Sequence, residues 1–175
     1  MLSDLQFFGG RGSASGKTSG LITGSSSNYG APGTYEVHRS GDLSAPNGMV
    51  FLSASFGEAS NYGRSEKKNI DTYHIKLANP LVVEGPTDAA MLKNAWEKLH
   101  PGKQYPKGPI NSKKWQARDK QNASALSKSG YDAIIYKKSN GNHEVQIAKK
   151  DSGKLIKTKS TKHSGKLYDY KGDWV

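Results

Sequence analysis

The sequence predicts an α+β fold, in which a mostly antiparallel sheet encloses a small helical insert. Short segments of strand-like composition occur on both sides of one helix-forming region, residues 88–129. The pair Asn140-Gly141 lies between the last two of these segments, where it favours the tight turn of a β-hairpin. Strands and helices do not alternate along the chain, so a parallel sheet built from βαβ units is not expected.

Six segments have the apolar content and the flanking turn residues of strands. They are residues 35–39, 49–53, 72–77, 81–83, 131–136 and 143–148. A polar loop over residues 41–47 separates the first two strands, and Asn79-Pro80 ends the third. A short helix is expected over residues 56–62, with Gly63 following it.

Two longer helices are expected inside the insert. Thr87 can cap the first helix, over residues 88–99, by accepting a hydrogen bond from a free backbone N–H. The apolar face of that helix is expected to hold Ala89, Leu92, Ala95, Trp96 and Leu99. The second helix, over residues 112–129, is expected to end at Gly130. Its expected inward side chains are Trp115, Ala123 and Leu126.

Composition predicts one domain with less regular ends. Of the 175 residues only 34% are hydrophobic, which suits one domain with a modest core. Residues 1–33 are rich in Gly and Ser and are interpreted as a flexible leader. Residues 34–150 are expected to form the folded domain, and residues 151–175 a basic carboxyl-terminal tail.

The net charge of +11 indicates which classes of partner the protein attracts. A field of this sign attracts nucleic acid, acidic protein surfaces and nucleotide phosphates. The lysines of residues 149–171 are interpreted as a solvated tail, with contact to nucleic acid or an acidic partner as the alternative. The absence of cysteine excludes disulfides and thiolate chemistry, and the histidine spacing predicts no metal site.

The sequence also bears on location. No apolar run is long enough for a membrane span, and the amino terminus lacks the basic region of a Sec signal. The protein is therefore expected in the cytoplasm, or delivered into a target cell by a phage or a secretion system.

Polar and aromatic residues recur at the ends of the predicted elements. His38 and Arg39 end the first strand, and Phe51 lies on an apolar strand that follows a glycine. Tyr62 ends the short helix, and Glu144 lies on the last strand. Because Val145 and Ile147 should face the core, alternation turns Glu144 to the other face, into a possible cleft.

This order resembles the ADP-ribosyltransferase superfamily, the group that includes diphtheria-like toxins and poly-ADP-ribose polymerases. His38, Tyr62 and Glu144 match the His–Tyr–Glu signature of one branch, over residues 34–150. Asn79-Pro80-Leu81 and the segment 130–135 are similar to landmarks of bacterial and phage members. The resemblance implies a split antiparallel β-sandwich core and NAD as the substrate, with no metal.

The resemblance also implies a role for each residue. His38 would hydrogen-bond a ribose of NAD, Tyr62 would stack on the nicotinamide ring, and Phe51 would flank its other side. Glu144 would bind the 2′-hydroxyl of the nicotinamide ribose and stabilise the positive charge that develops as nicotinamide leaves. Arg39 would offset the pyrophosphate charge.

A second branch of the superfamily has an Arg–Ser–Glu signature, which Arg39, Ser53, Ser55 and Glu144 nearly satisfy. There Arg39 would bind phosphate and Ser53 would orient Glu144. Asn142 stands where many members of that branch carry Glu or Gln. Which of the adjacent His38 and Arg39 anchors NAD therefore stays open, whereas Glu144 is common to both branches.

Taken together, the sequence predicts a mono-ADP-ribosyltransferase of toxin or effector type, acting on an unknown protein or nucleic acid. An immunity protein is a further expected partner. Two alternatives remain: a non-catalytic basic module that binds nucleic acid, and an NAD glycohydrolase. Each residue also has an ordinary interpretation, for example packing for Phe51 and a solvated carboxylate for Glu144.

Overall fold

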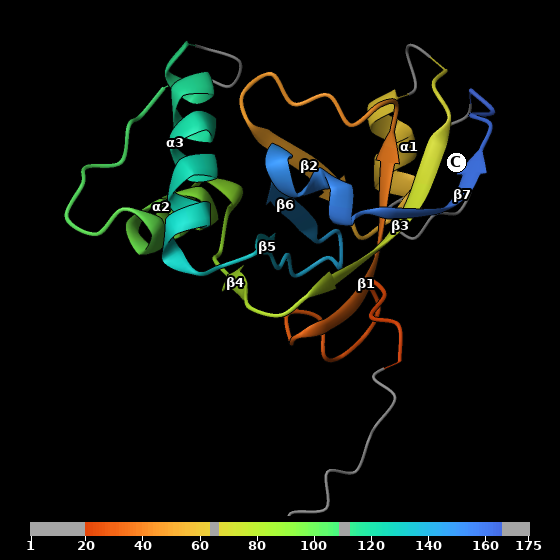
Figure 1. Cartoon of the computed structure of the whole chain (residues 1–175), viewed down its shortest axis with the longest axis horizontal. Coiled ribbons are helices and arrows are strands. Elements are labelled where there is room, and N and C mark those ends of the chain that lie inside the picture. The colour runs from red at the N-terminus through yellow and green to blue at the C-terminus, as the bar shows by residue number, and fades with distance from the viewer. Residues whose placement is uncertain (1–19, 64–66, 109–112, 166–175) are drawn as a thin grey trace, which may run out of the picture.

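The computed structural model describes residues 20–63, 67–108 and 113–165, and these residues form a mixed α and β structure (Figure 1). The described strands are β1 (Gly33–Ser40), β2 (Met49–Ser53), β3 (Ile70–Leu77), β4 (Pro80–Val83), β5 (Ala133–Tyr136), β6 (Glu144–Ala148) and β7 (Ile156–Thr161). The helices are α1 (Phe56–Gly63), α2 (Asp88–Leu99), α3 (Lys113–Ser129) and a 3₁₀ helix, η2 (Lys149–Lys154). The α+β class expected from the sequence is confirmed.

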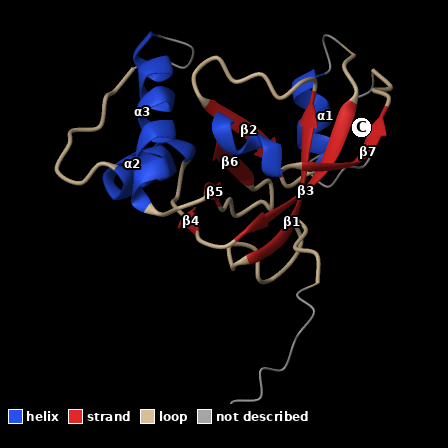
Figure 2. Cartoon of the chain, viewed as in Figure 1, coloured by secondary structure: helices blue, strands red, loops and turns tan. Residues whose placement is uncertain are grey.

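The strands form one sheet in the order β4-β5-β6-β2-β1-β3-β7, but the sheet is nearly divided between β2 and β1. Strands β1 and β3 pair along eight residues and β2 and β6 along five, whereas β1 and β2 share the single pair His38–Ser53. Pairing of these strands is antiparallel except between β4 and β5, which are parallel, an arrangement that the long connection through the helical insert allows. Figure 2 shows the two halves at an angle to each other.

Two apolar clusters hold these layers together. The first joins β1 and β3 to the inner face of β2, β5 and β6, so the two halves of the sheet pack against each other. It includes Tyr35, Val37, Val50, Leu52, Ile75, Ile135, Val145 and Ile147. The second packs the opposite face of β2, β4, β5 and β6 on the helices. It includes Met49, Leu81, Val83, Met91, Ala95, Leu126, Ile134 and Ala148.

The insert follows the predicted pattern with local differences. The Thr87 side chain accepts a hydrogen bond from the Ala90 N–H at 3.2 Å, which confirms it as the amino-terminal cap of α2. The prediction for the apolar face of α2 is wrong at one position, because Ala89 is exposed. Met91, which was not predicted, is buried instead. On α3 Leu126 is buried as expected, whereas Trp115 and Ala123 are half-buried. Polar side chains of α3 are buried as well: Arg118, Asp119 and Asn122.

The expected boundary of the folded domain at residue 34 is too late. Ile22 and Tyr29 are 1% and 2% exposed and belong to the first apolar cluster. The Ile22 N–H donates to the Thr34 carbonyl, and the Ile22 carbonyl accepts from the Glu36 N–H, so this segment lies along β1. The remainder of the expected leader, residues 1–19, lies outside the described residues.

The expected tail also takes part in the fold. Strand β7 pairs antiparallel with β3, and the Lys157 ammonium lies 2.5 Å from the Asp71 carboxylate. Its side chains are mostly exposed, which explains why alternation of apolar residues did not reveal the strand. Residues 166–175 lie outside the described part of the chain.

The two landmark segments near residues 79 and 132 lie next to each other. The Asp132 carboxylate accepts hydrogen bonds from the backbone N–H groups of Ala78 and Asn79, at 2.5 and 3.1 Å. The Asn79 side chain donates to the Gly130 carbonyl at 3.0 Å. These bonds fix where β4 and β5 start, so in this chain the segments have a structural role.

Candidate active site

Three predicted site residues lie in one row across three neighbouring strands. Ser53 is the partner of His38 in the β1–β2 pair and of Glu144 in the β2–β6 pair. Directly opposed residues of antiparallel strands share a face and lie close together. The row therefore runs through the point where the two halves of the sheet join. Glu144 faces away from the fully buried Val145 and Ile147, as alternation predicted.

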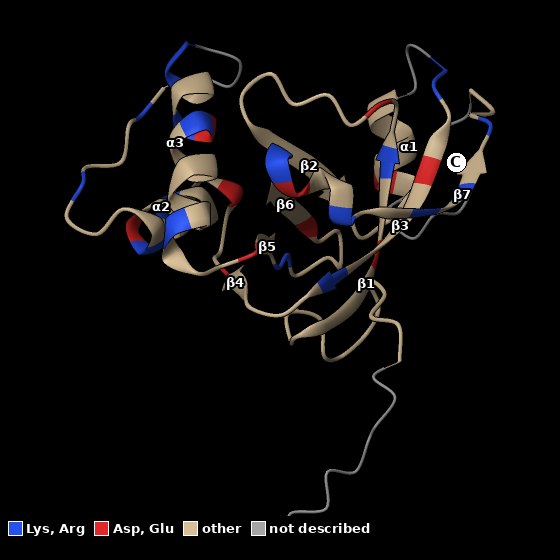
Figure 3. Ribbon diagram, viewed as in Figure 1, with Lys and Arg blue, Asp and Glu red and all other residues tan. Residues whose placement is uncertain are grey.

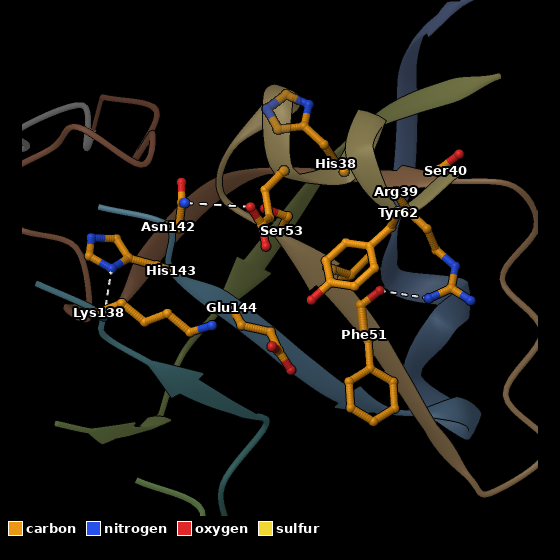
Figure 4. A pocket seen from close by; sticks show the side chains of 13 residues that line it. His38, Arg39, Ser40, Phe51, Ser53, Tyr62, Lys138, Asn142, His143 and Glu144 are labelled. Atoms are coloured by element: carbon orange, nitrogen blue, oxygen red, sulfur yellow. Dashed lines mark hydrogen bonds between the residues drawn. The ribbon is translucent and has the colours of Figure 1, made fainter. Parts of the chain in front are cut away.

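The row lines a cavity of about 350 Å³ (Figure 4). Its walls are His38, Arg39, Ser40, Phe51, Leu52, Ser53, Glu58, Ala59, Tyr62, Lys138, Asn142, His143 and Glu144. A second cavity of about 390 Å³ shares Phe51, Tyr62, Lys138 and Glu144 with the first and extends to α2 and α3. Glu144 thus stands where the two cavities meet.

Glu144 is a half-buried carboxylate in a restrained position. The Gln146 side-chain amide donates to its Oε1 at 2.5 Å. Burial raises the pKa of Glu144, the hydrogen bond from Gln146 and the Lys138 ammonium oppose that rise, and the Asp88 and Glu58 carboxylates add to it. The site therefore holds a carboxylate whose charge is poorly solvated.

The surroundings of His38 favour the neutral form of its imidazole. Its Nδ1 lies 3.1 Å from the Thr72 hydroxyl, and its Nε2 lies 3.8 Å from the Glu36 carboxylate. Burial lowers the pKa of His38, while Glu36 raises it and Lys159 lowers it further. The Phe56 ring packs against it at 5.7 Å between centroids. A fixed, neutral ring of this kind is suited to hydrogen-bonding a hydroxyl group.

Arg39 has a different environment from its neighbour. Its guanidinium donates to three backbone carbonyls, those of Asp42, Phe51 and Ser44, at 2.5, 2.7 and 3.1 Å. These bonds tie the loop over residues 41–47 to β2. These three bonds use three of the five N–H donors of a guanidinium. Arg39 lines the first cavity, and its expected contact with phosphate stays a prediction.

The two aromatic residues lie beside Glu144. Tyr62 is 76% exposed and Phe51 half-buried, and both line the two cavities. Figure 4 shows their rings on the side of the site to which the Glu144 carboxylate points. These positions are compatible with the flanking of a flat ligand that the family resemblance implies.

The two serines differ in what they contact. Ser53 lines the first cavity, and its hydroxyl accepts a hydrogen bond from the Ser55 N–H at 3.0 Å. The Ser55 hydroxyl accepts the Glu58 N–H at 3.2 Å and so caps α1, and Ser55 does not line either of the two cavities.

Sequence reasoning missed several polar residues of the site. Lys138 and His143 come from the β5–β6 hairpin, and the His143 Nδ1 accepts the Lys138 N–H at 3.0 Å. The Lys138 ammonium lies 3.6 Å from Asp88. Asp119 reaches the second cavity from α3. The hairpin could have pointed to the first pair, because its turn immediately precedes Glu144. The position of Asp119 depends on how the insert packs.

Comparisons with known proteins give only distant likenesses. No protein-family model matches the chain, and no curated protein matches it. One solved structure that resembles it belongs to the M. tuberculosis MbcT-MbcA toxin-antitoxin complex, at 11% identity and a TM-score of 0.47, over 77% of this chain and 87% of the other. Another is an anti-CRISPR protein, at 12% identity and a TM-score of 0.40, over 71% and 96%.

Two further observations concern the described residues. They contain no group of three or more His, Cys, Asp or Glu side chains that could hold a metal ion. In the same part of the chain, no helix is both long and apolar enough to cross a bilayer.

Proposed function

We propose that this protein is a mono-ADP-ribosyltransferase, which cleaves NAD at the bond between nicotinamide and ribose and transfers ADP-ribose to a macromolecule. The observation that carries the proposal is the row formed by His38, Ser53 and Glu144, which lines one cavity at the junction of the half-sheets. The same cavity holds both aromatic residues that the family resemblance implies.

The chemistry needs a carboxylate at Glu144. As the bond between C1 of the ribose and nicotinamide breaks, its electron pair leaves with neutral nicotinamide, and positive charge develops on the ribose. A fixed negative charge in a poorly solvated position stabilises that transition state more than it stabilises the bound substrate. Glu144 meets this requirement through its half-buried position and its hydrogen bond with Gln146.

The remaining wall residues would bind and orient NAD. The first cavity measures about 350 Å³, which is within the range of small-molecule sites. Tyr62 and Phe51 offer aromatic surfaces for the nicotinamide ring, and His38 offers a ring nitrogen for a ribose hydroxyl. Arg39 and Lys138 supply positive charge for the pyrophosphate.

Between the two branch signatures, the contacts favour His–Tyr–Glu. Three of the Arg39 donors are bound to carbonyls, whereas the His38 ring is buried beside the cavity with one short partner, Thr72. We therefore assign the anchoring of NAD to His38, and to Ser53 a supporting position between His38 and Glu144.

The test is release of nicotinamide from NAD by the purified chain, with and without cell extract. Glu144→Gln is expected to lower release at least 100-fold, as loss of a transition-state contact typically does. The matched control is Glu97→Gln, which makes the same change on the exposed face of α2. Equal release by wild type and Glu144→Gln would overturn the proposal.

The destination of ADP-ribose separates transfer from hydrolysis. Label from NAD on a macromolecule supports a transferase, whereas free ADP-ribose alone supports the NAD glycohydrolase alternative. A role as a toxin or effector predicts that expression inside cells arrests growth, that Glu144→Gln does not, and that a co-expressed immunity protein restores growth.

A non-catalytic basic module is the second candidate, and the exposed lysines of β7 are the observation that favours it. It predicts nucleic-acid binding that weakens with salt and is equal in wild type and Glu144→Gln, without release of nicotinamide.

A further inference from the structure

The second cavity opens the proposed catalytic carboxylate to the helical insert. Its outer wall consists of Asp88, Met91, Leu92, Trp115, Gln116 and Asp119, and these six do not line the first cavity. A group bound there reaches Glu144 through a cavity that His38 does not line. A transfer reaction needs such a place for its second substrate.

Asp119 is a buried carboxylate on this wall that the chemistry described above does not use. It is 7% exposed. Burial raises the pKa of Asp119 to about 6, against the effect of the neighbouring Arg118 guanidinium, and the Glu144 carboxylate raises it further. A carboxylate that titrates near neutral pH is well suited to accept a proton from a nucleophile.

Trp115 precedes Asp119 by one helical turn, so both side chains reach the same cavity. The Arg118 guanidinium lies 4.1 Å from the centre of the indole, which holds the ring in place. The side-chain amides of Gln116 and Gln146 complete this part of the wall. An aromatic surface beside amide and carboxylate groups can stack on an unpaired nucleobase and hydrogen-bond its edge.

The helical insert carries much of the positive charge of the protein, mostly on exposed lysines. Residues 88–129 contain nine Lys and Arg but three Asp and Glu, a net charge of +6 of the total +11. Blue segments mark α3 and the loop before it in Figure 3. The exposed Lys113 and Lys120 lie on the same helical face as Gln116, one turn to either side. Positive charge therefore borders the cavity.

The carboxylates inside the second cavity and the positive charge at its border together favour a nucleic acid over a protein as the acceptor. The cavity carboxylates alone would suit a cationic side chain, but the basic border repels a cationic peptide. A nucleic acid satisfies both, because its bases carry uncharged amino donors and its phosphates carry the negative charge.

We propose that this cavity is the acceptor subsite and that it binds an amino-bearing base of a single-stranded nucleic acid, with Asp119 as the proton acceptor. This inference rests on the proposed cleavage of NAD. The base amino nitrogen forms a bond to C1 of the ribose while the bond to nicotinamide breaks. Nicotinamide leaves with that electron pair, and the proton of the amino group passes to Asp119.

The reaction is tested with labelled NAD and single-stranded RNA or DNA oligonucleotides, scored separately for labelled oligonucleotide and for nicotinamide released to water. Asp119→Asn is expected to lower labelling of the oligonucleotide about 100-fold, as loss of a general base does, and thermal melts check that the variant folds. Comparing the RNA and DNA arms identifies the natural source of the base.

Binding is measured in parallel by the anisotropy of a labelled oligonucleotide. Trp115→Ala is expected to weaken binding about tenfold, and Trp115→Phe to restore it because a stacking surface returns. In the double variant Lys113→Gln with Lys120→Gln, the slope of the logarithm of the binding constant against the logarithm of salt concentration should become shallower by about 0.7 for each lysine. The control pair, Lys98→Gln with Lys128→Gln, removes two charges at a third cavity of the insert, lined by other residues, and should have no effect.

The outcomes distinguish this inference from the proposed function. Release of nicotinamide without label on any oligonucleotide, or with label on protein instead, overturns the acceptor while the NAD chemistry stands. Labelling by Asp119→Asn at the wild-type rate overturns the role of that carboxylate. If the wild type releases no nicotinamide, the proposed function and the proton transfer both fail. Binding that is unchanged by Trp115→Ala and by the first lysine pair overturns the base subsite whatever the reaction shows.

Discussion

Ser53 on β2 and Glu144 on β6 lie directly opposite each other, at the end of the β2–β6 pairing. On its other side Ser53 opposes His38, through the single residue pair that joins the two halves of the sheet. The halves diverge beyond this pair, and the cavity opens there. The topology that brings the three residues together thus also creates the space in which they could act.

Glu144→Gln is expected to stabilise the protein while it removes activity. Because the folded structure raises the pKa of Glu144, this group contributes stability only below its unfolded pKa, and that contribution is lost as the pH rises through the folded value. The variant should therefore melt at a higher temperature than wild type at pH 7 to 8. Thermal melts across pH test this, and the difference should shrink below about pH 4.3, the ordinary pKa of Glu. A lower melting temperature at pH 8 would contradict it.

Release of nicotinamide should fall on acidification at a higher pH than an ordinary glutamate would give. The proposed chemistry needs ionised Glu144, and burial raises the pKa of that carboxyl above its usual value. A pH profile of kcat/KM in wild type measures the midpoint. Gln146→Leu removes the amide that donates to Glu144 and should move the midpoint to still higher pH. A midpoint that stays in place in this variant argues against Glu144 as the titrating group.

Local patterns predicted the elements whose signals are contained within a few residues. The cap at Thr87, the strand β2 and the outward orientation of Glu144 each follow from neighbours in the sequence. Strand β7 could not be predicted in this way, because its residues are mostly exposed and pairing with β3 holds it in place. Ile22 was missed because the short apolar pair Leu21-Ile22, in a segment rich in Gly and Ser, gives no periodic signal.

Some residues of the candidate site could likewise be predicted from the sequence, and others could not. His38, Tyr62 and Glu144 could be proposed from the order of motifs along the chain, and all three line one cavity. The carbonyl contacts of Arg39 depend on the path of the following loop, and the position of Asp119 depends on the packing of α3. Both are long-range outcomes of folding, for which a single sequence carries no local signal.

Arg39→Lys is expected to destabilise the protein. A lysine can replace the charge but cannot span three carbonyls in the geometry of a guanidinium. We expect a loss of about 1–2 kcal/mol in the free energy of unfolding, together with faster amide exchange in residues 41–47. Lys138→Gln, which removes another cation from the cavity, should leave that exchange unchanged. Unchanged stability and unchanged exchange in Arg39→Lys would contradict the role of Arg39 in holding the loop.

His163→Ala is expected to loosen α1, although His163 lies far along the chain. The Gly165 N–H donates to His163 Nδ1 at 2.7 Å, and the His163 Nε2 donates to the Ser60 carbonyl at 2.8 Å. Loss of these bonds should cost about 1–3 kcal/mol of unfolding free energy. Because α1 also carries Glu58 and Tyr62, KM for NAD should rise too. Ser60→Ala keeps the carbonyl and should have a smaller effect, and an unchanged melting temperature in His163→Ala would disprove the link.

Gly63→Ala is expected to separate α1 from β1. A Cβ at Gly63 would stand 1.5 Å from the Ser40 hydroxyl oxygen and 2.5 Å from its Cβ, so the helix or the strand must shift. Overpacking of this kind typically costs about 1–3 kcal/mol. Ser40→Gly removes both clashing atoms, so the double variant should regain most of the lost stability. A double-mutant cycle by chemical denaturation measures this coupling, and additive effects of the two substitutions would show that the contact does not set the position of the helix.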